Sequence, residues 1–172
     1  MKTIISNEYN LTDEDINEVV KRVKVLLINN NEVILGYSNH EYQFPGGHVK
    51  DGEELVDAIN REVEEETGIK LNLKEAKPFA RLYGYYKDWP KVGNNRKIEI
   101  YYYEIKTLEK PNLANTKLTN NEIKGNFELR TIPLSNIEEE LTKNIQVYKD
   151  KHGITKEMLE VFRIYNDNII VK

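Results

Sequence analysis

The chain has 172 residues, of which 39% are hydrophobic and 31% are charged, a composition typical of a folded globular protein and not of a disordered one. It contains no cysteine, which excludes disulfides and thiolate zinc sites, and its net charge of −4 argues against a general nucleic-acid-binding protein. We expect one domain over residues 1–172, with a core at about 20–141 and a C-terminal helix at about 156–165.

We expect no signal peptide, and no stretch of the sequence reaches the roughly 18 apolar residues that a membrane span needs. The first residues offer only the apolar pair Ile4 and Ile5 before polar residues follow. We therefore expect a cytoplasmic protein without a membrane partner.

The first elements along the chain are a short helix and a β-hairpin. Leu11 to Glu18 predicts a short helix that is capped at Thr12. Val20 to Ile28 is rich in β-branched residues and predicts a strand, and Glu32 to Tyr37 predicts the strand that returns. Asn29 to Asn31 supply the residues of the turn between them.

A glycine-containing turn precedes the next helix. Phe44 to Gly47 ends regular structure, because its glycines permit positive φ angles and close approach of the backbone to a ligand. Asp51, with Glu54 three residues later, predicts the N-terminal cap of a helix, and Gly68 predicts its C-terminal end. Leu71 to Leu73 then predicts a short strand.

The second half of the chain predicts more strands joined by polar loops. Ala80 to Tyr86 and the alternating segment Lys97 to Ile105 predict strands, with a polar loop from Lys87 to Asn95 between them. Thr107 to Gly125 predicts a long loop with a turn of helix, and Phe127 to Ile132 predicts a strand.

Two helices are expected near the C-terminus. Pro133 opens the first, which covers Ile137 to Leu141. The second places the apolar residues Met158, Leu159, Val161, Phe162 and Tyr165 on one face. This face either docks onto the core or forms a homodimer. Strands that alternate with helices indicate an α/β protein whose helices cover a sheet.

The segment from Asp51 to Glu66 carries eight acids and one base, a local charge of −7. At about 100° per residue, Leu55, Ile59 and Val63 form the buried stripe of the helix. The outward face contains Glu54, Asp57 and Glu64, whose carboxylates an exposed, solvated helix explains.

Glu62 and Glu66 lie on or beside the buried stripe, where the exposed-face explanation fails. They also lie near the C-terminal end of the helix, where the helix dipole disfavours anions. Partly buried carboxylates need cationic partners, and Arg61 is one base among many acids. Because the ligands are carboxylates, a bound hard cation, Mg²⁺ or Mn²⁺, is the simplest partner.

The same segment resembles the signature of the Nudix family. That signature is a glycine, a glutamate after five residues and, seven residues later, Arg-Glu-aliphatic-x-Glu-Glu-x-Gly-aliphatic. Here Gly47, Glu53 and the run from Arg61 to Ile69 fill every specified position, and Pro45 and Gly46 supply a common lead-in.

The resemblance implies an α/β/α sandwich around a mixed β-sheet, in which the signature forms a loop-helix-loop. It also implies hydrolysis of the phosphoanhydride bond in a nucleotide-type small molecule, a nucleoside diphosphate linked to another group X. The metal ligands would be Glu62, Glu65 and Glu66, together with a backbone carbonyl of Gly46 or Gly47. Arg61 would orient these glutamates, and Glu53 would be an ancillary acid. A glutamate would act as general base.

Residues outside the signature are candidates for substrate choice and for a further acid. Glu122 and Glu128 are the acid candidates, with an exposed structural role equally open for each. The substrate-binding candidates are Tyr85, Tyr86, Trp89 and His48. Tyrosine sixteen or seventeen residues after the signature resembles diadenosine polyphosphate hydrolases, whereas Gly84 stands where many ADP-ribose pyrophosphatases have proline.

Two other functions share this scaffold. A catalytically silent nucleotide-binding sensor commonly loses acids of the signature, and this signature is complete. An isomerase of the isoprenoid type needs a catalytic cysteine, which this chain lacks. The sequence therefore favours the hydrolase and leaves the sensor as the alternative.

Overall fold

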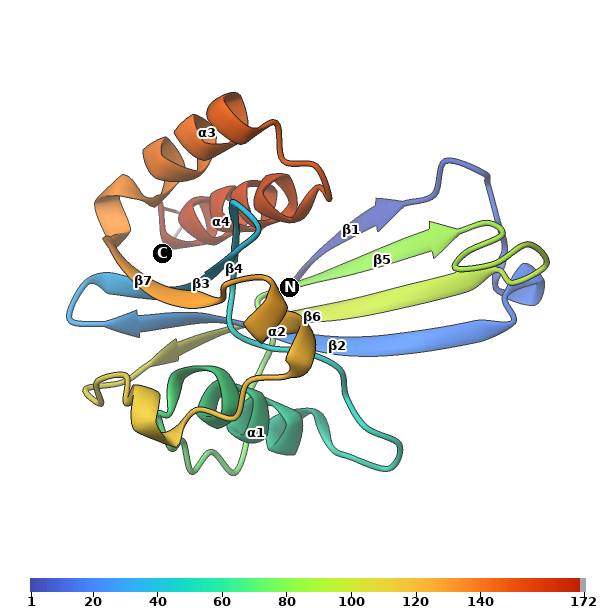
Figure 1. The fold of residues 1–172 in the computed structure, drawn as a ribbon. Coiled ribbons are helices and arrows are strands. Elements are labelled where there is room, and N and C mark those ends of the chain that lie inside the picture. Colours follow the sequence, from blue (N-terminus) through green and yellow to red (C-terminus); the bar gives the residue numbers. More distant parts are fainter. Residues whose placement is uncertain (171–172) are drawn as a thin grey trace.

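The computed structural model describes residues 1–170, and the side chains of residues 1–167. A mixed sheet of seven strands lies between α1 (Leu55–Thr67) on one face and α3 (Ile137–Tyr148) with α4 (Ile154–Ile170) on the other (Figure 1). This arrangement confirms the expected α/β/α sandwich. No helix within residues 1–170 is long and apolar enough to cross a membrane.

The strands of the sheet follow the order β1-β5-β6-β2-β3-β4, and β7 pairs with β3. Their bounds are β1 (Lys2–Ser6), β2 (Glu18–Asn29), β3 (Glu32–Ser38), β4 (Glu41–Gln43), β5 (Ala80–Tyr86), β6 (Arg96–Lys106) and β7 (Glu128–Pro133). The pairs β1–β5 and β2–β6 are parallel, and the other pairs are antiparallel. The five longer predicted strands and the hairpin of β2 and β3 are thereby confirmed.

Alternation along β2 supplies both halves of the core. Val23, Val25 and Leu27 pack in the cluster beneath α1, whereas Leu26 and Ile28 pack in the cluster beneath α3 and α4. The predicted apolar face of α4 is buried in the second cluster, through Met158, Leu159, Val161, Phe162 and Tyr165. Core docking of this face is therefore confirmed, and a homodimer through it is not available.

The structure corrects the predicted helix near the N-terminus and the predicted strand after α1. The helix expected over Leu11 to Glu18 is only the 3-10 turn η1 (Asp13–Asp15), because β2 already begins at Glu18. Residues 71–73 form no strand; the side-chain amide of Asn60 bonds both the N–H and the carbonyl of Leu73, in place of a neighbouring strand.

Two helix boundaries also differ from expectation. Helix α1 begins at Leu55 with Glu54 at its N-cap, because a turn from Lys50 to Glu53 comes first, and Asp51 does not cap it. Gly68 ends it as predicted, with φ of 69°. After the 3-10 turn η3 (Leu134–Asn136), α3 runs beyond Leu141 to Tyr148, since Ile145 continues the stripe of Ile137 and Leu141.

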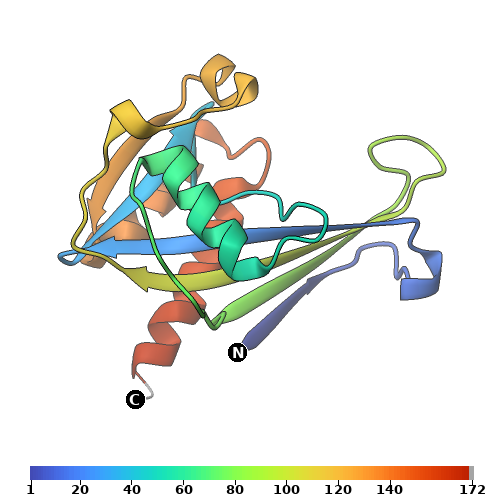
Figure 2. The ribbon, with the colours of Figure 1, turned by 90° about the horizontal axis from the view of Figure 1, so that it is seen from below.

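The long segment after β6 crosses the C-terminal end of α1 (Figure 2). It contains the 3-10 turn η2 (Leu113–Asn115) and the short helix α2 (Asn120–Lys124), as the predicted loop with a helical turn requires. The backbone N–H groups of Asn112 and Lys117 donate to the carbonyls of Thr67 and Glu65. These carbonyls of the last helical turn have no partner within the helix, so the segment is fixed where α1 ends.

Candidate metal and phosphate site

A cavity of about 560 Å³ opens between the C-terminal half of α1, the loop after β4 and the segment that precedes α2. Glu62, Glu65 and Glu66 line it together with Gly46 and Gly47. The remaining lining residues are Arg22, Lys24, Gln43, His48, Lys50, Arg61, Lys117, Thr119, Asn121 and Glu122. The residues expected to hold metal therefore lie around one space, and basic residues face them.

The loop after β4 lies along the edge of β2. Val23 and Val25 donate their N–H groups to the carbonyls of Gly47 and Pro45, at 3.0 and 2.8 Å. Gly46 has φ of 139°, and a β-carbon on it would lie 2.2 Å from the carbonyl oxygen of Val23. Only glycine fits such a position, because an L side chain would meet both backbone strain and a clash. The sequence pattern thus places the loop directly against the sheet.

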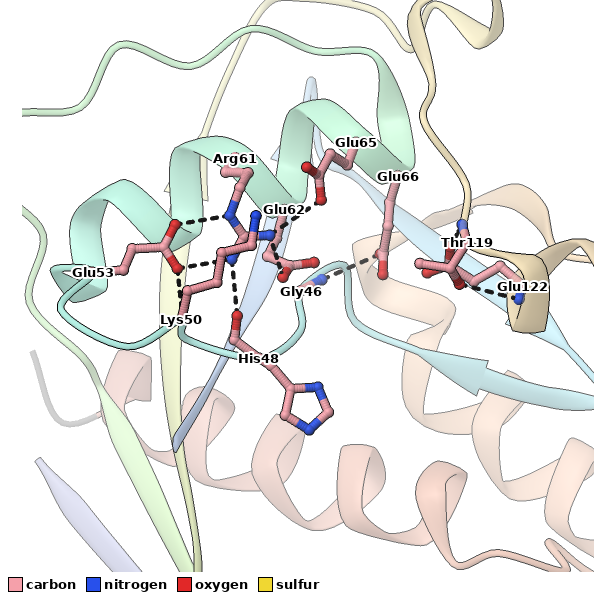
Figure 3. A network of polar contacts seen from close by, with 10 residues as sticks. All are labelled: Gly46, His48, Lys50, Glu53, Arg61, Glu62, Glu65, Glu66, Thr119 and Glu122. Atoms are coloured by element: carbon pink, nitrogen blue, oxygen red, sulfur yellow. Dashed lines mark hydrogen bonds and ion pairs between the residues drawn. The ribbon is translucent and has the colours of Figure 1, made fainter. Parts of the chain in front are cut away.

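Arg61 joins four parts of the site (Figure 3). Its Nε and Nη2 donate to Glu53, each at 2.8 Å, and Nη1 donates to Glu62 at 2.6 Å and to Glu65 at 3.1 Å. Nη2 also donates to the backbone carbonyl of His48 at 2.8 Å. Hydrogen bonds from Arg61 lower the pKa of Glu53 to about 2. Arg61 thereby fixes two of the three α1 glutamates that line the cavity, and the loop that faces them.

Glu66 is the buried acid of the site, with a relative exposure of 4%. Burial raises its pKa to about 8. The charge of Lys24 and the N–H of Gly46, which donates to the carboxylate at 3.2 Å, offset this only in part. Burial also raises the pKa of Glu62. Glu62 has Arg61 as its cationic partner, whereas Glu66 forms no ion pair among the described side chains. A carboxylate that loses solvation without such a partner favours binding of a proton or a metal ion.

The donor set fits a hard divalent cation, although its members are not drawn together around one point. Among residues whose side chains the structure describes, no three His, Cys, Asp or Glu side chains form a ready metal-binding group. Glu62 and Glu65 instead turn toward Arg61, as Figure 3 shows. The oxygen ligands and the desolvated carboxylate of Glu66 still suit Mg²⁺ or Mn²⁺.

Of the two candidate backbone ligands, the carbonyl of Gly46 is the freer. The carbonyl of Gly47 accepts from Val23 within the pairing of the loop with β2. In the part of the chain that the structure describes, the carbonyl of Gly46 accepts no backbone hydrogen bond of this kind. Metal ligation by either remains a prediction.

The two acids outside the signature have different surroundings. Glu122 lines the cavity, where its charge helps to raise the pKa of Glu66, and its carboxylate also accepts from the N–H of Thr119 in a capping box. Glu128 lies on β7 and pairs with Arg130 on the exposed surface, outside the cavity. The structure therefore brings only Glu122 to the glutamates of α1.

The four substrate-binding candidates are dispersed. His48 lines the cavity, and its Nε2 lies 3.2 Å from Nη2 of Arg22. Burial, reinforced by the charges of Arg22, Lys24 and Arg96, lowers the pKa of His48, so that the ring is neutral and its Nε2 accepts from Arg22. The assignment of Nε2 as the acceptor follows from this neutrality.

The three aromatic candidates lie outside the cavity lining. The hydroxyl of Tyr85 donates to Asp13 on the face of the sheet that carries α1. Tyr86 is on the opposite face, which Arg22 shares, and its ring lies 5.6 Å from that of Trp89. A role for any of them in substrate binding remains a prediction.

The sequence analysis missed the basic wall of the cavity, which consists of Arg22, Lys24, Lys50 and Lys117. A signal was present for two of them: Arg22 and Lys24 are charged residues on the face of β2 that carries the buried Leu26 and Ile28. No local pattern marks Lys50 or Lys117, because the folding of two loops brings them to the site.

Comparison with solved structures shows the same fold in proteins of distant sequence. A C. elegans Ap4A hydrolase shares 16% identity at a TM-score of 0.53, with 89% of this chain and 99% of that chain covered. A MutT protein from Methanosarcina mazei Go1 shares 17% identity at a TM-score of 0.56, with coverages of 87% and 96%. A MutT protein from Bacillus halodurans shares 19% identity at 0.52, with coverages of 70% and 72%.

The model of one protein family matches most of the chain. The NUDIX domain matches residues 18–150. This range contains Glu53 and Arg61 of the signature, helix α1, the loop after β4 and the segment that precedes α2. The resemblance that the signature segment indicated is thereby confirmed. The chain belongs to the NUDIX domain family.

Proposed function

We propose that the protein is a divalent-metal-dependent hydrolase that cleaves a phosphoanhydride bond in a nucleoside diphosphate linked to another group X. The observation that carries this proposal is that Glu62, Glu65 and the buried Glu66 line one cavity whose other wall is basic. Membership of the NUDIX domain family supports a reaction at a pyrophosphate bond. Mg²⁺ is the expected ion, and Mn²⁺ has the same ligand preference.

The chain supplies the position of each reacting part. Glu62, Glu65 and Glu66 would hold the metal with a carbonyl of Gly46 or Gly47, and Arg61 would fix the carboxylates of Glu62 and Glu65. When bound, the metal would supply Lewis-acid activation of water and of the phosphoryl oxygens. A cavity glutamate within hydrogen-bond reach of the attacking water would accept its proton, and Glu53 would support Arg61.

The decisive experiment is a screen of nucleoside diphosphate derivatives with Mg²⁺ or Mn²⁺, followed by release of phosphate, pyrophosphate or nucleoside monophosphate. Since one of the structural relatives is an Ap4A hydrolase, the screen includes dinucleoside polyphosphates. Glu65→Gln and Glu66→Gln should each reduce the rate by at least about 100-fold with the fold retained. Glu64→Gln is the matched control, because Glu64 lies on the same helix and outside the cavity lining.

Full activity in both the Glu65 and Glu66 variants would refute the assignment of these glutamates as metal ligands. Nucleotide binding without turnover under any metal condition would instead support the sensor. A cytoplasmic location and a homodimer stay predictions, and the dimer has no assigned surface.

A further inference from the structure

Arg22 lies on the basic wall of the cavity, across from the glutamates of α1. It is on β2, directly opposite His48 in a bridge between β2 and the loop after β4. In Figure 3 the ring of His48 points away from the carboxylates that Arg61 holds. The pair of Arg22 and His48 therefore occupies a part of the site distinct from the cluster of Arg61.

The guanidinium of Arg22 has too few partners for its degree of burial. Among the described side chains, its buried Nε has no hydrogen-bond partner, and its one side-chain hydrogen bond joins Nη2 to Nε2 of His48 at 3.2 Å. A guanidinium carries several N–H donors, and a buried donor without a partner destabilises the protein. The cation of Arg22 therefore lacks a partner for at least one buried N–H donor.

No carboxylate among the described side chains supplies the missing partner of Arg22. Within the described side chains, Arg22 forms no ion pair, and neither do Lys24, Lys50 and Lys117 on the same wall. Glu157 of α4 acts on Arg22 electrostatically, yet its carboxylate accepts its hydrogen bond from Tyr102. The electrostatic attraction of Glu157 therefore gives Arg22 a structural role but no hydrogen-bond acceptor.

The missing partner is an anion, and the lining of the cavity indicates which kind. Among the described residues, no Phe, Tyr or Trp lines the cavity, and the one imidazole there, that of His48, lies against Arg22. The planar guanidinium instead matches the oxygens of a phosphate group, with which it forms charge-assisted hydrogen bonds. Lys24, Lys50 and Lys117 add positive charge around the same space.

We propose that Arg22, held by His48, forms a subsite for a second phosphate group of the substrate, separate from the phosphate bound at the glutamates. This inference rests on the proposed function for the identity of the substrate, but the anion site is testable alone. It implies that the enzyme recognises the phosphate chain of its substrate more strongly than the base.

Binding of inorganic pyrophosphate in the presence of EDTA tests the subsite, because chelation removes any contribution of metal at the glutamates. Isothermal titration calorimetry should show millimolar or tighter binding to the wild-type protein and at least about tenfold weaker binding to Arg22→Gln. Lys21→Gln is the matched control. It removes one positive charge from the neighbouring position of β2, where Lys21 is exposed on the opposite face, and it should change the affinity by less than about twofold.

A measurement on the wild-type protein covers the case in which Arg22→Gln folds poorly. The ¹⁵N-¹H resonance of the Arg22 Nε should shift during the pyrophosphate titration. Equal binding by the Arg22 and Lys21 variants, an unshifted resonance, or absence of wild-type binding at millimolar concentration would each overturn the subsite. Arg22-dependent binding in a protein that hydrolyses nothing would refute the proposed function alone, whereas hydrolysis with Arg22-independent binding would refute the subsite alone.

Discussion

The backbone of Gly47 lies against the carboxylate of Glu62, so closely that a β-carbon on residue 47 would lie 2.5 Å from Oε2 of Glu62. The neighbouring Gly46 is different, because a β-carbon there would meet the backbone of Val23 at 2.2 Å. A side chain at residue 47 would thus meet a movable side chain, whereas one at residue 46 would meet the backbone of the sheet. We therefore expect a substitution at Gly47 to act on the position of Glu62 and a substitution at Gly46 to act on stability.

Gly47→Ala should displace the carboxylate of Glu62 and lower metal-dependent activity by roughly 10- to 100-fold, while the melting temperature stays close to that of the wild type. Gly46→Ala should destabilise the fold by about 2–3 kcal/mol or more, because strain at positive φ adds to the clash. Thermal unfolding and the rate on one substrate, measured on both variants, test this division. The reverse pattern, a stable Gly46 variant and an unfolded Gly47 variant, would contradict it.

Arg61→Lys should reduce activity by roughly 10- to 100-fold although the charge is kept, since an ammonium cannot bond Glu53, Glu62, Glu65 and the loop carbonyl of His48 together. The same variant should need a higher concentration of Mg²⁺ to reach its half-maximal rate. Arg163→Lys is the control, because Arg163 forms one exposed pair with Glu138. Equal activity in the two variants would show that Arg61 does not position the glutamates.

Binding of Mg²⁺ should stabilise the protein more at about pH 8.5 than at about pH 6. The pKa of Glu66 is about 8 in the folded protein and 4.5 in its ordinary state, so the unfolded chain binds fewer protons between these values. The free energy of unfolding of the metal-free protein therefore falls as the pH rises through this window. Because Mg²⁺ binds the ionised carboxylate, it should restore the free energy of unfolding that the metal-free protein loses at high pH.

Melting temperatures with Mg²⁺ and with EDTA, measured at both pH values, check this linkage. Glu66→Gln cannot ionise, so its metal-free stability should fall less between them. An equal gain from Mg²⁺ at the two pH values would rule out Glu66 as a ligand that exchanges a proton for metal.

Glu122→Gln should raise the Mg²⁺ concentration needed for half-maximal rate by roughly tenfold, whereas Glu128→Gln should leave it unchanged. Glu122 lines the cavity, and Glu128 pairs with Arg130 outside it. Glutamine at residue 122 keeps the capping box with Thr119, so the fold of α2 is preserved while the charge is removed. Identical metal requirements for the two variants would assign Glu122 to capping alone.

Patterns within short segments made much of this structure predictable. The alternation of β6 and the helical spacing of α4 each fix a local structure and a buried face, and both are confirmed. The same arithmetic placed Glu66 among buried residues, where the structure has it at 4% exposure. The signature then indicated the family correctly.

Features that depend on distant contacts were not predictable from such patterns. Leu71 to Leu73 resembles a strand locally, yet Asn60 on α1 supplies the hydrogen-bond partners of Leu73. Lys117 reaches the cavity because its N–H bonds the carbonyl of Glu65, a contact between segments far apart in the chain. The basic wall of the site arises from this kind of tertiary placement.

The pairing of the loop after β4 with β2 also protects the protein against association with other chains. Beyond its short pairing with β3, this side of β2 would present unpaired N–H and C=O groups, a template for strand addition. Residues 45–49 occupy that side through bonds to Lys21, Val23 and Val25. A variant that detaches the loop would therefore expose an unpaired strand edge of the sheet and would also disrupt the cavity. We expect such a variant to aggregate as well as to be inactive.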